Sequence, residues 1–116
     1  NVKKGESISY NRRYTANDDL IVGTIPIGYA DGYRRECRNK AFAEVNDRKA
    51  MVLGTVCMDQ IMVDLTNIKG VKKGDTAILF GPALITAGDI ADICDTISYE
   101  ILCGISKRVP RVYIKK

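Results

Sequence analysis

Apolar residues along this chain either alternate with polar ones or form short continuous runs, and both patterns predict β-strands over most of its length. The alternating stretch 6–14 predicts a first strand. The continuous apolar run 20–25 predicts a second strand that is buried on both faces and pairs with the first. The polar pair 46–47 separates the apolar stretches 41–45 and 50–53, which predicts a hairpin of two short strands.

Three later segments extend the β pattern. Residues 54–65 alternate and predict a strand that bends near residues 57–60. Residues 76–80 predict another core strand, which a Gly-Pro pair ends. Residues 109–114 predict a final edge strand, because Pro110 lacks the N–H that a central strand would need.

A helical period appears only near the C-terminus. Thr86 and Asp89 have the spacing of a capping box, and the apolar residues within 90–94 lie on one helical face. A second short helix follows, with Ser98 as its expected cap. Six or seven strands with two short helices near the C-terminus are typical of an antiparallel barrel or sandwich. We expect a mainly β fold, a Greek-key-like antiparallel β-barrel.

Composition narrows the class of protein. With 116 residues, 46% of them hydrophobic, residues 1–116 are expected to form one domain. The chain has no histidine, and its four cysteines form no CxxC pair, so no metal site is expected. Scattered cysteines in a chain of this size indicate reduced thiols and a cytoplasmic protein. The first residue is Asn1 rather than methionine, which suggests a piece of a longer protein.

The charge and hydropathy patterns limit the partners. The net charge is +4, with much of the excess in the last ten residues. Such a basic tail either contacts nucleic acid or is simply solvated, and we favour solvation and no nucleic acid. No apolar run approaches the length of a membrane span, so no membrane contact by this domain is expected.

Tyrosines are the most informative candidates for chemistry. In the stretch 24–33, an apolar strand runs into a tight turn that carries Tyr29, either as an interfacial aromatic or as a phenol at a pocket mouth. Without histidine, proton transfer near neutral pH requires tyrosine, cysteine, lysine or a perturbed carboxylate. A tyrosine base needs a cationic or hydrogen-bonding partner, and no such partner is evident beside Tyr10. By itself, Tyr10 is therefore interpreted as an aromatic residue of a strand.

Two further stretches are ambiguous by themselves. In the sequence Cys57-Met58-Asp59-Gln60, no base accompanies the thiol, so Cys57 is interpreted as a packing residue and Asp59 as holding a backbone turn. Tyr99 falls in the first turn of a predicted helix, where it either contacts a phosphate or is an interfacial tyrosine.

Four separated motifs, in this order, resemble the C-terminal domain of the alanine racemase family, the fold-type III pyridoxal phosphate enzymes of bacterial cell-wall synthesis. The resemblance covers nearly the whole chain. It implies a cytoplasmic isomerase, dimeric when full length, that interconverts L- and D-alanine for peptidoglycan. The motifs are residues 9–10, 22–32, 56–60, and 98–101 with 108–111.

The resemblance implies a role for five residues. Tyr10 matches the catalytic tyrosine, which removes or returns the α-proton on one face of the amino-acid substrate. Tyr29 matches a tyrosine that lines the inner entrance to the active site. Met58 matches the residue whose backbone N–H helps to hold the substrate carboxylate, with Asp59 as its supporting neighbour. Tyr99 matches a tyrosine that reaches the phosphate of the cofactor, pyridoxal 5'-phosphate.

In this family the lysine that binds the cofactor lies on an N-terminal barrel that is not in this sequence. The resemblance implies that the domain meets such a barrel both in its own subunit and in the partner subunit of a homodimer. It also implies that this piece alone is inactive. Arg35 and Arg111 fall in segments near the entrance, whereas Asn11 and Thr55 depart from the residues common in the family.

Two alternative functions remain open at this point. A serine racemase of the same family would share these motifs, because one pocket residue does not distinguish a methyl group from a hydroxymethyl group. A non-catalytic β-barrel binding module would use the basic tail on nucleic acid.

Overall fold

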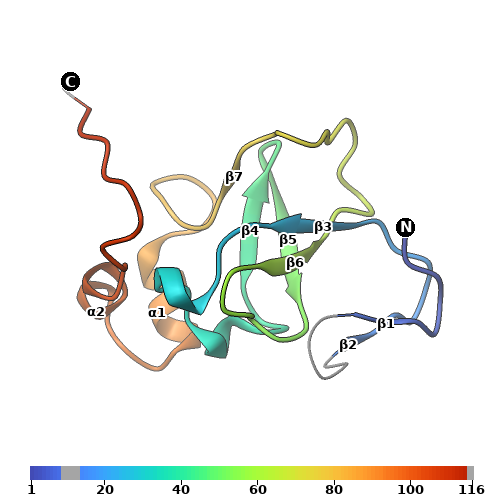
Figure 1. Cartoon of the computed structure of the whole chain (residues 1–116), viewed down its shortest axis with the longest axis horizontal. Helices are drawn as coiled ribbons and strands as arrows, with labels where there is room; N and C mark the ends of the chain where they lie inside the picture. Colours follow the sequence, from blue (N-terminus) through green and yellow to red (C-terminus); the bar gives the residue numbers. More distant parts are fainter. Residues whose placement is uncertain (9–13, 115–116) are drawn as a thin grey trace.

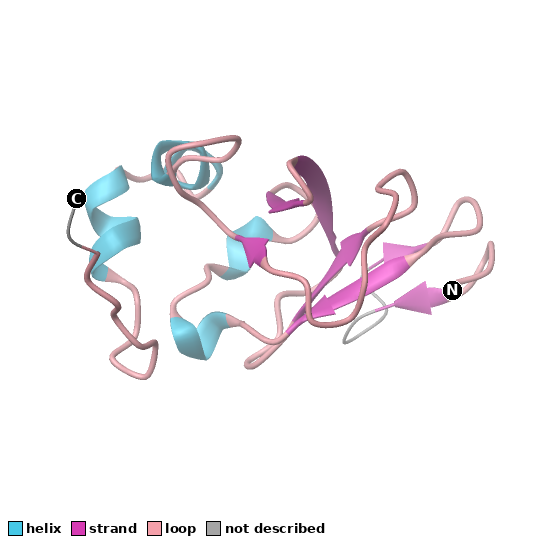
Figure 2. Ribbon diagram, turned by 90° about the horizontal axis from the view of Figure 1, so that it is seen from above, coloured by secondary structure: helices cyan, strands magenta, loops and turns pink. Residues whose placement is uncertain are grey.

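The computed structural model describes residues 1–8 and 14–114 of the chain. They form an elongated body with principal extents of 44 × 29 × 23 Å. The two helices gather at one end of the long axis, and the short hairpin of β1 (Ser7–Ile8) and β2 (Tyr14–Thr15) lies at the other (Figures 1 and 2). The central sheet lies between these two ends.

An antiparallel five-stranded sheet forms the body of the molecule, in the order β3-β6-β5-β4-β7. Figure 1 shows β4 and β5 running steeply across the direction of β3 and β6, so the sheet curls into a half-barrel. The predicted fold class, mainly antiparallel β with two short helices near the C-terminus, is confirmed. The strands are β3 (Val22–Ile25), β4 (Phe42–Val45), β5 (Arg48–Leu53), β6 (Ile61–Asp64) and β7 (Ala77–Ile78).

The predicted hairpin between β4 and β5 is confirmed. Val45 pairs with Arg48, so only Asn46 and Asp47 form the loop. Both loop residues have positive φ, 49° and 62°. Asn and Asp tolerate this conformation better than other non-glycine residues, and the two-residue turn that uses it matches the twist of the flanking strands.

The N-terminal pairing differs from the prediction. The expected single strand over 6–14 is instead two strands, because Ile8 pairs with Tyr14 while residues 9–13 lie outside the described part of the chain. Strand β3 pairs with β6 and not with the first strand. It is also not buried on both faces, since it lies at the edge of the curled sheet and Thr24 points to solvent.

Three predicted strands are shorter than expected or are not formed. Of 54–65 only Ile61–Asp64 is strand, because the Cys57 N–H donates to the Gln60 carbonyl and closes a turn before β6. Of 76–80 only Ala77–Ile78 is strand. Residues 109–114 form no strand. The Arg111 guanidinium binds the Val109 carbonyl and folds the start of that segment back on itself.

The helices α1 (Ala87–Ile93) and α2 (Ser98–Cys103) follow the sheet. The predicted capping box of α1 is confirmed, since Thr86 Oγ1 accepts the Asp89 N–H at 3.1 Å and Asp89 Oδ2 accepts the Thr86 N–H at 2.8 Å. The predicted Ser98 cap is wrong, because the N-cap is Ile97 and no side chain caps α2. Neither helix, nor any other in the described residues, is long and apolar enough to cross a membrane.

A single apolar core lies inside the half-barrel and continues under α1. Its members share nearly complete burial and come from the sheet, from the 3₁₀ helix Arg35–Cys37, from the loop before β6, and from α1. The largest fully buried side chains are Leu53, Ile61, Ile90, Val52, Val56, Val63 and Cys37. Burial raises the pKa of the Cys37 thiol to about 12, so the thiol stays protonated and serves as a packing group.

Candidate functional site

The turn that follows β3 positions Tyr29. It contains the 3₁₀ helix Tyr29–Asp31. The turn is closed by the Asp31 carboxylate, whose Oδ2 accepts the Gly28 N–H at 2.9 Å. Gly32 then adopts φ 108°, which a side chain would disfavour, and its N–H donates to the Tyr29 carbonyl. The phenol of Tyr29 is thereby held on the surface, where 44% of the residue is exposed.

This turn packs backbone to backbone against the loop before β6. The Tyr29 N–H donates to the Cys57 carbonyl and the Ala30 N–H donates to the Met58 carbonyl, both at 3.0 Å. A Cβ atom on Gly28 would lie 2.1 Å from the Cys57 oxygen, so only glycine permits this approach. The two motifs that resemble the family's entrance and carboxylate-binding segments are thus brought together.

A shallow pocket of about 380 Å³ lies where the two segments meet. Its lining includes Arg35, whose guanidinium carbon lies 5.9 Å from the centre of the Tyr29 ring. The Met58 N–H donates to no acceptor among the described residues. The pocket therefore combines an aromatic wall, a cation and a residue, Met58, whose backbone N–H has no acceptor among the described residues. The lining residues are Tyr29, Arg35, Thr55, Val56, Cys57 and Met58.

The sequence predicted that Asp59 holds a backbone turn, but in the structure its carboxylate binds an arginine instead. Its carboxylate oxygen Oδ1 accepts a hydrogen bond from Nη2 of Arg108 at 2.6 Å. Nε of the same arginine donates to Asp31 Oδ1 at 2.7 Å. These hydrogen bonds, the one to Asp59 first, raise the pKa of Arg108.

We name the resulting cluster the three-loop junction. It consists of the turn 28–32, the loop 57–60 and the segment 104–108. Sequence reasoning missed the parts of Asp31 and Arg108 in this junction. The only signal was that both residues fall inside the stretches that carry the family resemblance.

Tyr99 lies apart from the pocket. It is 73% exposed on α2 and is not among the residues that line the Tyr29 pocket. The helix is attached near that pocket by Arg34, which binds Glu100 at 3.0 Å and Glu36 at 2.9 Å. The pKa of Glu100 is lowered, first by the Thr96 hydroxyl and then by Arg34.

Other predicted residues have mixed outcomes. Tyr10, the expected base, and Asn11 lie outside the described residues. Cys57 is half-buried and its Sγ lies 3.7 Å from the Thr55 carbonyl, in keeping with a packing role. Arg111 does not reach the pocket, because its guanidinium binds the carbonyls of the segment 105–109. The described residues bring together no three side chains that could hold a metal ion.

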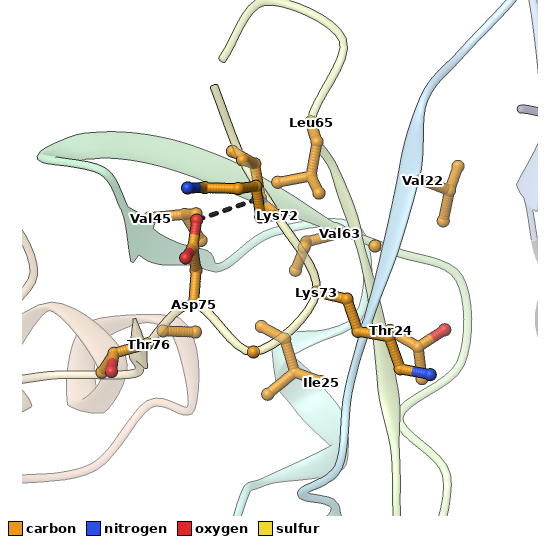
Figure 3. A pocket seen from close by; sticks show the side chains of 14 residues that line it. Val22, Thr24, Ile25, Val45, Val63, Leu65, Lys72, Lys73, Asp75 and Thr76 are labelled. Carbon is orange, nitrogen blue, oxygen red and sulfur yellow. Dashed lines mark hydrogen bonds between the residues drawn. The ribbon is translucent and has the colours of Figure 1, made fainter. Parts of the chain in front are cut away.

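A second cavity, of about 270 Å³, lies where the half-barrel fails to close (Figure 3). It is lined by residues of both edge strands, β3 and β7, and by the loop between β6 and β7. In that loop, Asp75 Oδ2 accepts the Lys72 N–H at 2.9 Å. None of the predicted site residues within the described chain lines this cavity, so the gap is separate from the Tyr29 pocket.

Comparison with known proteins decides the family. The family model described as "Alanine racemase, C-terminal domain" matches residues 1–113. The chain belongs to this family. An alanine racemase from Geobacter sulfurreducens is 51% identical over 117 residues, which cover 97% of this chain and 31% of that protein. The chain thus spans about a third of the length of the curated relatives that it matches.

Solved alanine racemases have the same fold. The structure from Clostridium difficile 630 superposes with a TM-score of 0.92 at 44% identity, over 97% of this chain and 30% of that one. The structure from Bartonella henselae, with covalently bound pyridoxal phosphate, superposes with a TM-score of 0.92 at 32% identity, over 97% of this chain and 32% of that one.

As an alanine racemase C-terminal domain, the chain presents a wall rather than a closed site. Tyr29, Met58 and Tyr99 are 44%, 52% and 73% exposed. The Tyr29 pocket contains no lysine.

Proposed function

We propose that this domain forms one wall of the active site of a pyridoxal-phosphate-dependent racemase that interconverts L- and D-alanine for peptidoglycan. In this proposal the full-length protein is a homodimer. Tyr10, Tyr29 and Met58 face the N-terminal barrel of the partner subunit, and Tyr99 faces the barrel of its own subunit. The observation that carries the proposal is the backbone contact that brings Tyr29 and Met58 to one open pocket. Alanine is favoured over serine because the relatives are named alanine racemases.

The pocket suits the carboxylate of an amino acid. The Met58 N–H is directed by two hydrogen bonds that hold the neighbouring peptide oxygens, so it can donate to an anion without rearrangement. Arg35 at the rim adds a positive charge that attracts the carboxylate. Tyr29 covers one side of the opening and limits how large a side chain can pass.

The proton transfer is assigned to Tyr10. Its phenolate oxygen takes the α-proton from one face of the substrate and becomes a hydroxyl, which returns a proton to the same face in the reverse direction. A tyrosine has an ordinary pKa near ~10, so Tyr10 requires a cationic or hydrogen-bonding neighbour to act as a base. In the proposed assembly the barrel supplies that neighbour.

The residues of this domain fit a contact to the cofactor but not its covalent attachment. The lining of the pocket beside Met58 offers the phenol of Tyr29, and it has no lysine amine to form a bond with an aldehyde. The exposed phenol of Tyr99 is a suitable donor to a phosphate oxygen. When bound, pyridoxal phosphate withdraws electrons from the α-carbon and so acidifies its proton.

A location in the cytoplasm accords with the cysteines. Cys37, Cys57, Cys94 and Cys103 are all free thiols in the structure, and a reducing compartment keeps such thiols free.

Replacing the proposed base tests this function. In the full-length protein with pyridoxal phosphate, Tyr10→Phe is expected to abolish α-proton exchange from one alanine enantiomer and to leave exchange from the other. Deuterium incorporation from heavy water, followed separately for L- and D-alanine by mass spectrometry, measures both. Tyr14→Phe, on the neighbouring strand β2, is the matched control and should leave both exchanges unchanged. Equal loss for both enantiomers in Tyr10→Phe would contradict the assignment.

A further inference from the structure

Arg108 connects the two loops that carry the proposed entrance tyrosine and the proposed carboxylate donor. Its Nε binds Asp31, two residues after Tyr29, and its Nη2 binds Asp59, the residue after Met58. One guanidinium therefore joins parts of the chain that are 77 and 49 residues away from it in sequence.

We propose that Arg108 is a positioning residue that fixes the Met58 N–H relative to the Tyr29 turn by clamping Asp31 and Asp59 together. The proposal rests on the function proposed above, and it adds a residue that touches neither substrate nor cofactor.

Asp31 is the fixed side of the clamp. Its side chain is only 12% exposed. One carboxylate oxygen accepts the Gly28 N–H, and its backbone carbonyl accepts the Ser106 N–H at 2.9 Å. Because Asp31 is already tied to its own turn and to the segment before Arg108, it gives the arginine a firm anchor.

Asp59 is the side that the clamp restrains. Its side chain is 62% exposed, and Arg108 is its only ion-pair partner in the described chain. The peptide groups on both sides of Met58 are held through their oxygens by the Tyr29 turn. Beyond Met58 the loop is closed internally, because the Cys57 N–H donates to the Gln60 carbonyl, and the Asp59 contact adds the link from this part of the loop to Arg108.

Arg108 itself is held in position by local hydrogen bonds. Its N–H donates to Ser106 Oγ at 3.2 Å. Arg111 Nη1 donates to the carbonyls of Ser106 and Val109, each at 2.7 Å. The guanidinium is therefore presented from a fixed turn. A lysine would provide one point charge in place of the planar fork and would not hold both carboxylates in the same geometry.

The clamp matters for geometry more than for stability. Half of the Arg108 side chain is exposed, and ion pairs this exposed contribute little to the free energy of unfolding. A displacement of about 1 Å in a substrate-positioning group can lower the rate about 100-fold. Loss of the clamp should therefore affect substrate binding while the fold persists.

The test uses the full-length enzyme and the variants Arg108→Gln, Arg108→Lys and Asp59→Asn. Each variant is expected to raise KM for alanine about tenfold or more, with a smaller change in kcat. The double variant Arg108→Gln with Asp59→Asn is expected to be no worse than Arg108→Gln alone, because Arg108→Gln already breaks the contact that Asp59→Asn removes. Arg48→Gln removes a positive charge from the exposed end of β5 and should leave KM unchanged.

Hydrogen exchange gives a second measurement that does not depend on turnover. Amides of 57–60 are expected to exchange faster in Arg108→Gln, whereas those of β4 and β5 keep the rates of the unmodified protein. Unchanged KM together with unchanged exchange at 57–60 would overturn the clamp. Faster exchange throughout the domain, with a matching fall in the unfolding temperature, would also overturn it, because Arg108 would then have a purely structural role.

The two proposals fail in different ways. If the unmodified full-length protein does not racemise alanine, the proposed function is wrong, while the exchange rates at 57–60 still test the clamp. If it racemises alanine and Arg108→Gln has the KM and local exchange rates of the unmodified protein, the function stands and the clamp is wrong.

Discussion

The apolar core and the three-loop junction are held together in opposite ways. In the core, side chains such as Val52, Ile61 and Ile90 are buried, and their packing is stabilised by the hydrophobic effect and by dispersion. At the junction, backbone groups meet directly, and two ion pairs to Arg108 join the loops. The core can absorb a change of volume by small shifts of many side chains, whereas the junction has no side-chain layer that can yield.

This difference separates stability from function. Apolar burial supplies most of the free energy of folding, so damage to the core should lower stability first. The junction contributes few buried apolar atoms but sets the relative position of Tyr29 and Met58. Damage there should change the pocket more than it changes the unfolding midpoint.

The largest expected effect on stability comes from the core. Ile90→Ala removes a side chain that is 2% exposed on α1 and should lower the free energy of unfolding by about 2–5 kcal/mol. Urea unfolding followed by circular dichroism measures the loss. In the full-length enzyme, KM for alanine at a temperature where the variant is folded should match that of the unmodified protein. A large rise in KM would contradict the separation of the two regions.

Gly28→Ala is the corresponding change at the junction. The added Cβ would lie 2.1 Å from the Cys57 oxygen and 2.4 Å from the Met58 oxygen, so the two backbones must move apart. The cost of such overpacking is about 1–3 kcal/mol, smaller than that of Ile90→Ala, but the loss of alanine binding should be greater. Urea unfolding and KM measure the two effects.

Gly88→Ala is the matched control for that substitution. Gly88 lies within α1, and its added Cβ would meet the Thr86 hydroxyl at an ordinary 3.5 Å. Alanine should stabilise the helix by up to about 1 kcal/mol and leave KM unchanged. Similar effects of Gly28→Ala and Gly88→Ala would show that backbone contact at the junction has no special importance.

The smallest expected effect concerns pH and the cap of α1, which belongs to neither region. The hydrogen bonds of Asp89 to Thr86, first the one from the Thr86 N–H, lower the pKa of the Asp89 carboxyl. The pKa of Asp89 is therefore lower in the folded state than in the unfolded state. The charged carboxylate stabilises the fold fully above the ordinary aspartate pKa of about 3.9. This stabilisation is lost as pH falls through the lowered value.

Asp89→Asn should remove that part of the acid dependence. Asparagine keeps an acceptor for the Thr86 N–H but carries no charge, so the unfolding temperature of the variant should fall less steeply below about pH 4. Thermal unfolding at a series of pH values measures the slope. Asp92→Asn, on the same helix, serves as the control, and an equal change in its slope would contradict the special role of Asp89.

The fold features that could be predicted from the sequence are those set by neighbouring residues. The hairpin loop depends on the αL tolerance of Asn46 and Asp47, and the start of α1 depends on Thr86 and Asp89, three residues apart. The failures have distant causes. The loop 54–60 is shaped by its contact with the Tyr29 turn, and no local pattern reports that contact.

The candidate site shows the same limit. Local pattern alone left Tyr29 as either an interfacial aromatic or a phenol at a pocket mouth, and it gave Cys57 a packing role and Asp59 a backbone turn. The resemblance to a family brought them together, and the structure supports their proximity through hydrogen bonds. The Arg108 contacts were missed because they cross 49 and 77 residues, and ion pairing at such separation leaves no periodic signal.

The extended segment after Pro110 has a consequence for handling the domain by itself. Val112, Tyr113 and Ile114 are 82%, 91% and 85% exposed, and all three residue types favour β-strands. Such a segment is a template for strand addition, so purified copies of the isolated domain should aggregate through this end at high concentration. The two lysines that follow it in the sequence oppose that association by charge repulsion. Solubility of the isolated domain should therefore fall as salt screens those lysines.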